Sequence, residues 1–435
     1  MDTVPVLETE EARTPGQAHP TWPSRRAAAA WFAGFTLYAS LGAIFTGHAD
    51  RTWAVWAAGG YALTTLLLRF GKSWIPPLGT ALGVGVLAPV LWLITQRPAT
   101  AEVIVIDRSV NHLLSYGTPY LPPGQLTNWK AYNPYLPIME LFGLPRSIGL
   151  IGVLGDPRIW MAVGTAAALA ASFAIVQPHR LRDCVRCRRH AATLTAIALA
   201  SPVFGYPLAL GITDPPIIAL LCLTLALAYR NRWAWSGVAL AVACAMKSTA
   251  WAAIPVLAVL AWAREAPGAA LRFTVTTVAA TGLLSLIAAP GAVTRPEAVI
   301  QNTVDFPLGL TKHKTPAQSP LPGHLLASLG PGGHLAAVVL MAVAAVAFAG
   351  WMLLRPPRTV LAAGCRLAVG YATVFILDPA SRFGYFIYPL ALIGWVSCTT
   401  LSSERIGATP PFRLPLPFQR PPGPASGPNA RSGSL

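Results

Sequence analysis

The sequence predicts an all-α protein whose helices cross a membrane many times. Charged residues make up only 11% of the 435 residues, the hydrophobic set makes up 54%, and the mean hydropathy is +0.53. A soluble domain carries roughly 25% charged residues. Long uncharged stretches recur along the whole chain, and a spanning helix needs about 20 apolar residues. Because backbone groups cannot stay unpaired in lipid, runs without polar alternation favour helices over a barrel.

We expect about twelve spanning helices. The first apolar run begins near Ala27 behind a polar tail, and no small-residue cleavage site follows it, which indicates a retained anchor rather than a signal peptide. The expected spans are 27–45, 53–68, 74–95, 159–177, 191–209, 215–229, 233–246, 250–263, 273–290, 332–353, 359–377 and 384–400.

The least regular part of this topology is the pair of runs at 233–246 and 250–263. Each is about 21 Å long as a helix, which is short of a full span. We interpret them as a hairpin whose apex, at Lys247, lies in an outer-facing cavity. A single tilted helix in their place would move Arg264 and the basic residues after it to the outside.

The net charge of +16 follows the positive-inside rule. With the N-terminus inside, the cytoplasmic side carries +14 and the outer, non-cytoplasmic side carries +2. The basic excess therefore needs no nucleic-acid-binding patch to explain it. We expect a multi-pass membrane protein, surrounded by lipid, with both termini in the cytoplasm and no nucleic acid as a partner.

The domain organisation is one transmembrane domain, 25–401, between two tails. Residues 1–24 and 402–435 are rich in Pro, Gly, Ser and Thr and lack apolar periodicity, which is typical of disordered tails. Within the domain, the loops 96–147 and 291–331 are both long and both on the expected outer side. Loops of such length are usually functional.

No metal site is predicted. Cys184 and Cys187, followed by His190, form a CxxC in a basic inner loop. A zinc site of this kind needs a second ligand pair at matching spacing, and the sequence contains none.

The first outer loop begins with an amphipathic pattern that predicts an interfacial helix on the outer leaflet. Its apolar stripe consists of Val103, Ile106, Val110, Leu113 and Leu114. Glu102 and Asp107 border the stripe. A carboxylate at such a boundary tends to have a raised pKa, which suits a general base. A solvated helix with two ordinary acids fits the same pattern.

Several motifs follow one another in an order that resembles a known enzyme family. They are Leu-Leu-x-x-Gly-x-Pro-Tyr at 113–120 followed by Tyr132–Tyr135, Gly211–Pro216, Ala245–Lys247 with Pro255, and Asp378–Tyr385. The series resembles the GT-C superfamily of membrane glycosyltransferases, which use polyprenyl-phosphate sugars. Within it, the chain is similar to glycosyltransferase family 87, a bacterial mannosyltransferase-like group.

The resemblance implies a reaction and a base. The family's base is the acid that opens the first outer loop, usually Asp; counting back from Leu113 places Glu102 at this position, with Asp107 as a rival. The implied reaction transfers a hexose, with mannose expected, from a polyprenyl-phosphate donor to a hydroxyl of a cell-envelope glycan or glycolipid. It would take place at the outer face of a bacterial cell membrane with no bound cofactor, and the sequence leaves a divalent metal requirement open. The family's usual Tyr-Pro-Pro is replaced here by Tyr132-Asn133-Pro134-Tyr135, which bears on the acceptor.

The donor phosphate needs cations, because its charge grows as it leaves. Outer cations run against the positive-inside bias and are functional candidates. The candidate substrate-binding residues are Arg382, Lys247, Lys312, His313, Lys314, Asp214, Tyr120, Asn133 and Tyr135. Structural alternatives exist: Lys312 and Lys314 can be simply solvated, Arg382 can pair with Asp378, and Lys247 can cap its hairpin.

A secondary transporter or a lipid-linked sugar flippase is the main alternative, since about twelve helices suit that architecture too. The polar residues gather on one face and both long loops lie outside, which favours an enzyme that works at that face. A scaffold subunit would leave the outer acids without a role.

Overall fold

The computed structural model describes residues 24–96, 99–177 and 185–403, and these residues form helices and no strand. The predicted tails at 1–24 and 402–435 fall outside the described residues, except for Ser24, which caps the first helix, and the end of the last helix. Cys184 of the CxxC pair also lies outside them. The α-helices are α1 (Arg25–Phe45), α2 (His48–Phe70), α3 (Ile75–Leu82), α4 (Ala88–Gln96), α5 (Ala101–Tyr116), α6 (Leu144–Ser147), α7 (Pro157–Val176), α8 (Val185–Ala200), α9 (Pro202–Leu210), α10 (Asp214–Tyr229), α11 (Trp233–Cys244), α12 (Ala253–Arg264), α13 (Pro267–Ala288), α14 (Pro296–Ile300), α15 (Pro322–Ala327), α16 (Pro331–Leu354), α17 (Val360–Leu377) and α18 (Ile387–Ser403).

Each expected span is helical, as one helix or as consecutive helical segments, so the prediction of an all-helical membrane protein is confirmed. Among the described residues, six helices are long and apolar enough to cross a membrane, or seven if α8 and α9 count as one broken span. The remaining expected spans are α2 and the short apolar helices α10, α11, α12 and α18, and the total of about twelve stays a prediction. The two helices of the 233–263 hairpin have 12 residues each, and a short 3₁₀ turn, Ser248–Ala252, joins the apex to α12.

The expected span 191–209 is not one straight helix. It bends by 59° between α8 and α9. The bend lies at Ser201-Pro202, where proline has no backbone N–H to continue the helical ladder and disfavours a helical conformation at the preceding residue.

The helix α10 lies at the centre of the core, and most of its side chains are buried. This helix packs against α7, α11, α17 and α18. By contrast, α13 and α16 keep most of their apolar side chains exposed. An apolar face that wide and unpartnered suits contact with lipid.

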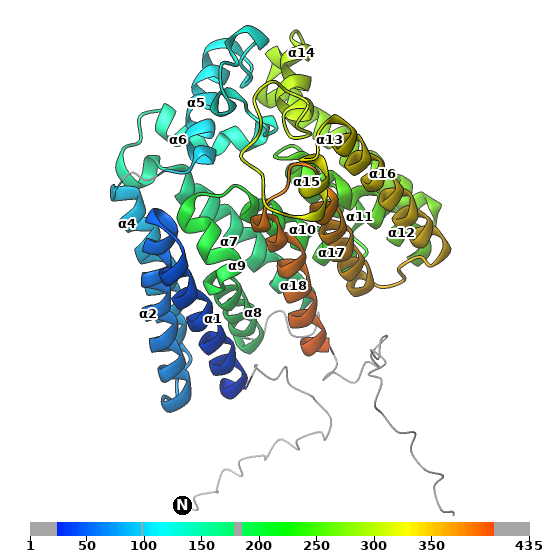
Figure 1. Cartoon of the computed structure of the whole chain (residues 1–435). Coiled ribbons are helices and arrows are strands. Elements are labelled where there is room, and N and C mark those ends of the chain that lie inside the picture. The colour runs from blue at the N-terminus through cyan, green and yellow to red at the C-terminus, as the bar shows by residue number, and fades with distance from the viewer. Residues whose placement is uncertain (1–23, 97–98, 178–184, 404–435) are drawn as a thin grey trace, which may run out of the picture.

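The two long loops, 96–147 and 291–331, lie at the same end of the molecule (Figure 1), and their outer position stays a prediction. The N–H of Gly291 donates to the carbonyl of Gly117 at 2.8 Å, and the N–H of Asn133 donates to Oδ1 of Asn302 at 2.7 Å. A Cβ on Gly291 would lie 2.8 Å from the Tyr116 carbonyl oxygen, so only glycine permits the first contact. The loops therefore form one layer above the helices.

The first outer loop does contain the predicted helix, α5, but its buried face differs in one position. Val103, Ile106, Val110 and Leu113 are buried, whereas Leu114 is 58% exposed and Val105 is buried in its place. The helix packs on α6, α7 and the 3₁₀ segment Pro137–Gly143. Protein contacts on this side, rather than a flat lipid surface, determine which side chains are covered.

Candidate active site

A cleft opens beside the first turn of α5, at the end of the molecule that holds both outer loops. It encloses about 880 Å³ including its open mouth. Five segments far apart in the sequence contribute side chains to it. Its lining residues are Ala101, Glu102, Val105, Trp129, Tyr132, Pro134, Tyr135, Lys247, Ser248, Thr249, Phe306, Pro307, Thr315, Pro316, Phe375, Asp378, Ala380, Arg382 and Tyr385.

Three contacts hold the side chain of Glu102 in place in this cleft. Its Oε2 accepts the backbone N–H of Thr213 at 2.9 Å and the Thr213 hydroxyl at 2.8 Å. Its Oε1 lies 3.3 Å from Nη1 of Arg382. The side chain keeps 14% of its surface exposed. Glu102 is therefore an oriented carboxylate that still reaches the cleft.

The contact between Glu102 and Thr213 depends on a close approach at Gly211. This residue has a φ of +80°, and a Cβ there would lie 2.4 Å from a methyl group of Val103 and 2.9 Å from Cγ of Arg158. Only glycine tolerates both the left-handed backbone and this proximity. The resulting fit brings the turn before α10 against the first turn of α5.

Lys247 lies at the floor of the cleft, as expected for the hairpin apex. Its Nζ is 2.6 Å from Oδ1 of Asp214, and Tyr388 donates to the same oxygen at 2.8 Å. The rings of Tyr135 and Tyr385 flank the ammonium group at 5.7 and 5.4 Å. Asp214 itself does not line the cleft, so it supports Lys247 from behind.

Arg382 pairs with Glu102 rather than with Asp378, the alternative partner that the sequence offered. It lies in the turn between α17 and α18, and its side chain is 38% exposed. Asp378 also lines the cleft, where its Oδ1 accepts the Ala380 N–H at 2.9 Å. Burial raises the pKa of Asp378.

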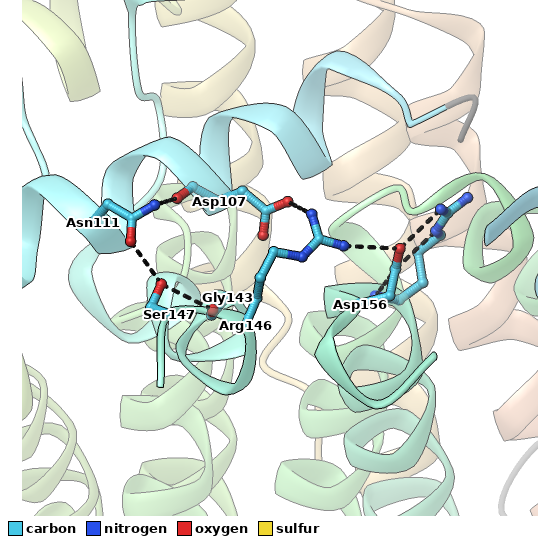
Figure 2. A network of polar contacts seen from close by, with 7 residues as sticks. Asp107, Asn111, Gly143, Arg146, Ser147 and Asp156 are labelled. Atoms are coloured by element: carbon cyan, nitrogen blue, oxygen red, sulfur yellow. Dashed lines mark hydrogen bonds and ion pairs between the residues drawn. The ribbon is translucent and has the colours of Figure 1, made fainter. Parts of the chain in front are cut away.

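Asp107 lies outside the cleft lining, in a separate polar network (Figure 2). Its carboxylate forms an ion pair with Arg146 of α6, and Arg146 also contacts Asp156 at 3.5 Å. Asp156 caps α7 by accepting the Arg158 N–H, as the Asp-Pro-Arg sequence there suggests. Burial raises the pKa of Asp107 to about 6, in spite of the neighbouring Arg146. This geometry gives Asp107 a role in joining α5 to α6 and α7.

The remaining basic candidates lie at the mouth. Lys312 and Lys314 are exposed and do not line the cleft, although Thr315 next to them does. The ring of His313 meets the edge of Tyr132 at 6.3 Å. In the structure this tripeptide is thus beside the cleft rather than inside it.

Tyr120 and Asn133 are buried behind the cleft wall. The Tyr120 hydroxyl donates to the Tyr135 carbonyl at 3.0 Å, and Asn133 Oδ1 accepts the Tyr135 N–H at 3.0 Å. Asn133 Nδ2 donates to Oε1 of the buried Glu140 at 2.7 Å. Burial raises the pKa of Glu140 to about 8, although the Asn133 hydrogen bond lowers it. These residues hold Tyr135 in position.

Sequence reasoning did not propose Thr213 or Asp378 as site residues, and it missed that Trp129, Tyr132 and Phe306 form one aromatic wall of the cleft. The Gly211–Pro216 and Asp378–Tyr385 motifs contain the first two, so their signal was present. Phe306 had no motif around it. Within the described residues, no group of three or more His, Cys, Asp or Glu side chains is placed to hold a metal ion.

Comparison with known proteins adds one finding to this geometry. The family model described as glycosyltransferase family 87 matches residues 135–379, which is more than half of the chain. No curated protein and no solved structure gives a match. The matched range includes Tyr135, Lys247 and Asp378 of the cleft, whereas Glu102 precedes it and Arg382 follows it. The chain belongs to glycosyltransferase family 87 and is a membrane glycosyltransferase.

Proposed function

We propose that this protein transfers a hexose, with mannose expected, from a polyprenyl-phosphate donor to a hydroxyl of a cell-envelope glycan or glycolipid. The reaction would take place at the outer face of the cell membrane, with both termini in the cytoplasm. The observation that carries the proposal is the meeting of one oriented carboxylate and two cations in one cleft: Glu102, Arg382 and Lys247.

The proposed chemistry is a displacement at the anomeric carbon. Glu102 takes the proton of the acceptor hydroxyl as the acceptor oxygen bonds to the anomeric carbon. The bond from that carbon to the phosphate oxygen breaks, and its electron pair leaves with the polyprenyl phosphate. Because phosphate is a good leaving group once its charge is stabilised, no general acid is needed on that side.

Arg382 and Lys247 are the proposed phosphate ligands. Arg382 offers a planar fork that can hold two phosphate oxygens at once. Lys247 supplies a point charge at the floor, where Asp214 and two tyrosine rings hold it. Polar groups fixed in advance need not reorganise as the phosphate charge develops.

In this proposal the ion pair between Glu102 and Arg382 links donor binding to the availability of the base. A donor phosphate that draws Arg382 away would leave Glu102 hydrogen-bonded to Thr213 alone. Its Oε1 would then be free to accept the hydrogen bond of the acceptor hydroxyl.

The test is a transfer assay on purified protein in lipid nanodiscs. A panel of labelled polyprenyl-phosphate sugars is offered together with glycan and glycolipid acceptors, and we expect transfer from one donor class. The same donors, incorporated in protein-containing vesicles, report translocation. Movement of the lipid-linked sugar across the bilayer without transfer would support the flippase alternative and contradict the proposal.

A further inference from the structure

The two outer loops build a small hydrophobic cluster of their own, apart from the core around α10. Its buried members are Leu126, Ala131, Tyr132 and Phe306, with Trp129 packed against it. The rings of Tyr132 and Phe306 stack at 4.4 Å with an interplanar angle of 9°. Trp129, Tyr132 and Phe306 also line the cleft, so the cluster gives the cleft one rigid aromatic wall.

The wall also carries two polar groups. Among the described residues, neither the indole N–H of Trp129 nor the hydroxyl of Tyr132 has a hydrogen-bond partner. The indole N–H groups of Trp53 and Trp233 lack a partner as well, but these two residues are buried away from the cleft, whereas Trp129 is half-buried and lines it. A polar group on a cleft-lining ring, left without a partner, is available to a ligand.

The wall is placed where the acceptor must lie. Val105, one turn after Glu102 on α5, lines the cleft together with the aromatic residues. Arg108, one further turn along, donates to the Ala131 carbonyl at 2.9 Å and so ties the Trp129 segment to the same helix. The cations Arg382 and Lys247 come from other segments, the α17–α18 turn and the hairpin apex. Glu102 can therefore lie between a donor whose phosphate the cations hold and a second molecule that the wall holds.

We propose that Trp129, Tyr132 and Phe306 form an acceptor subsite that binds a saccharide, which rests on the proposed function. A sugar ring has apolar C–H faces and a rim of hydroxyls. The faces match an aromatic ring, and the hydroxyls match the unpartnered N–H and O–H groups. An acyl chain would cover both polar groups without offering either of them a hydrogen bond, which is costly. The acceptor hydroxyl at Glu102 thus belongs to a sugar, either of a free glycan or of a glycolipid headgroup.

The first arm of the test measures transfer kinetics in nanodiscs. Trp129→Ala should raise the acceptor KM about tenfold, because it removes an aromatic stacking surface. Donor Kd and kcat should stay unchanged. Trp129→Phe keeps a ring but lacks the N–H, so its acceptor KM should lie between those of the wild type and Trp129→Ala. Trp235→Ala is the matched control, since Trp235 is 61% exposed and lies outside the cleft. An acceptor KM that Trp129→Ala leaves unchanged would overturn the subsite.

The second arm measures saccharide binding without any donor. Unlabelled manno-, gluco- and galacto-oligosaccharides are tested by saturation-transfer NMR, because the chain has 14 tryptophans and total fluorescence would not single out one. We expect signals for at least one series in the wild type and in Trp235→Ala, and their loss in Trp129→Ala. Signals that persist in Trp129→Ala, or that are absent from the wild type for both the free and the lipid-linked oligosaccharides, would overturn the inference.

The two arms separate failure of the subsite from failure of the proposed function. Binding that depends on Trp129, in a protein that transfers from no donor, would support the subsite and contradict the proposed reaction. Transfer with an acceptor KM that does not change in Trp129→Ala would support the proposed reaction and contradict the subsite. Offering the same oligosaccharide free and lipid-linked identifies the source: binding of both supports a free glycan, and binding of the lipid-linked form alone supports a glycolipid headgroup.

Discussion

Glu102 and Arg382 are separated by 280 residues in the chain, yet Nη1 of Arg382 lies 3.3 Å from Oε1 of Glu102. The contact joins the first turn of α5 to the turn between α17 and α18. It brings the proposed base and a proposed phosphate ligand together before any donor binds. The predictions below separate the chemical roles of these residues from their structural roles.

Arg382 should contribute to donor affinity mainly through the shape of its guanidinium group. Arg382→Ala should weaken donor binding more than Arg382→Lys, because lysine keeps the charge but cannot hold two oxygens in a plane. The measurement is the Kd of a labelled polyprenyl-phosphate sugar in nanodiscs. Arg295→Ala, an exposed arginine outside the cleft, serves as the control. Equal affinity in all four proteins would leave Arg382 as a structural partner of Glu102.

Lys247 and Asp214 should behave as a buried ion pair. Asp214→Leu alone should lower the free energy of unfolding by about 3–5 kcal/mol, because it leaves a buried ammonium without its partner. The double variant Asp214→Leu/Lys247→Met should recover much of this loss, since an apolar pair of similar size removes the uncompensated charge. Thermal unfolding in detergent measures both.

The same double variant tests whether Lys247 also binds phosphate. We expect it to fold and yet to bind the donor more weakly than the wild type. Donor affinity equal to that of the wild type would limit Lys247 to a structural role.

Glu140 should make stability depend on pH. Burial raises its pKa to about 8 in the folded protein, from 4.5 as the ordinary value. Between these values the folded state binds one more proton than the unfolded state, so the free energy of unfolding falls as pH rises. Glu140→Gln mimics the neutral acid and can still accept the Asn133 hydrogen bond. Its Tm should therefore exceed that of the wild type near about pH 8 and match it near about pH 4. Parallel Tm curves over this range would contradict the assignment.

The outer position of the two long loops can be tested by cysteine labelling in a background without the six native cysteines. Gly124 and Gln318 are exposed, one in each loop, and a Cβ at Gly124 meets no neighbour. Cysteines there should react with an impermeant thiol reagent in intact cells. Arg232→Cys, on the expected inner side, should react only after permeabilisation. Labelling of one outer position without the other would show that the two loops lie on opposite sides of the membrane. The predicted topology would then be wrong, most directly at the 233–263 hairpin.

The helices were predictable because each is a long apolar run with a clear local signal. The bend at Ser201-Pro202 also had a local signal, since proline interrupts the helix there. The exposure of Leu114 and the burial of Val105 had none, because Leu114 fits the apolar stripe, Val105 lies on another face of the helix, and only the neighbours of α5 decide which of them is covered.

The site was predictable in part. Glu102, Lys247, Tyr135 and Arg382 lie in motifs and meet in one cleft. Their contacts could not be derived, because the partner of Arg382 is 280 residues away and Asp378 is the nearer acid in sequence. The position of α5 determines whether Arg382 pairs with Glu102 or with Asp378, and the pattern of apolar residues does not predict that position. The aromatic wall depends in the same way on the packing of one loop against another.

Separate substitution of Glu102 and Asp107 tests most directly whether Glu102 is the catalytic base. Glu102→Gln keeps the size and hydrogen-bonding capacity of the side chain but cannot take the proton. Glu102→Gln should therefore bind the donor and lose transfer activity by about 10²- to 10⁴-fold. Asp107→Asn, whose acid lies outside the cleft and pairs with Arg146, should lower the Tm and keep most of the activity.

The decisive measurement is the transfer rate of Glu102→Gln and Asp107→Asn side by side, with donor Kd determined for each. We expect only Glu102→Gln to lose transfer, while both variants bind the donor. Loss of transfer in Asp107→Asn alone, or full activity in both variants, would contradict this expectation.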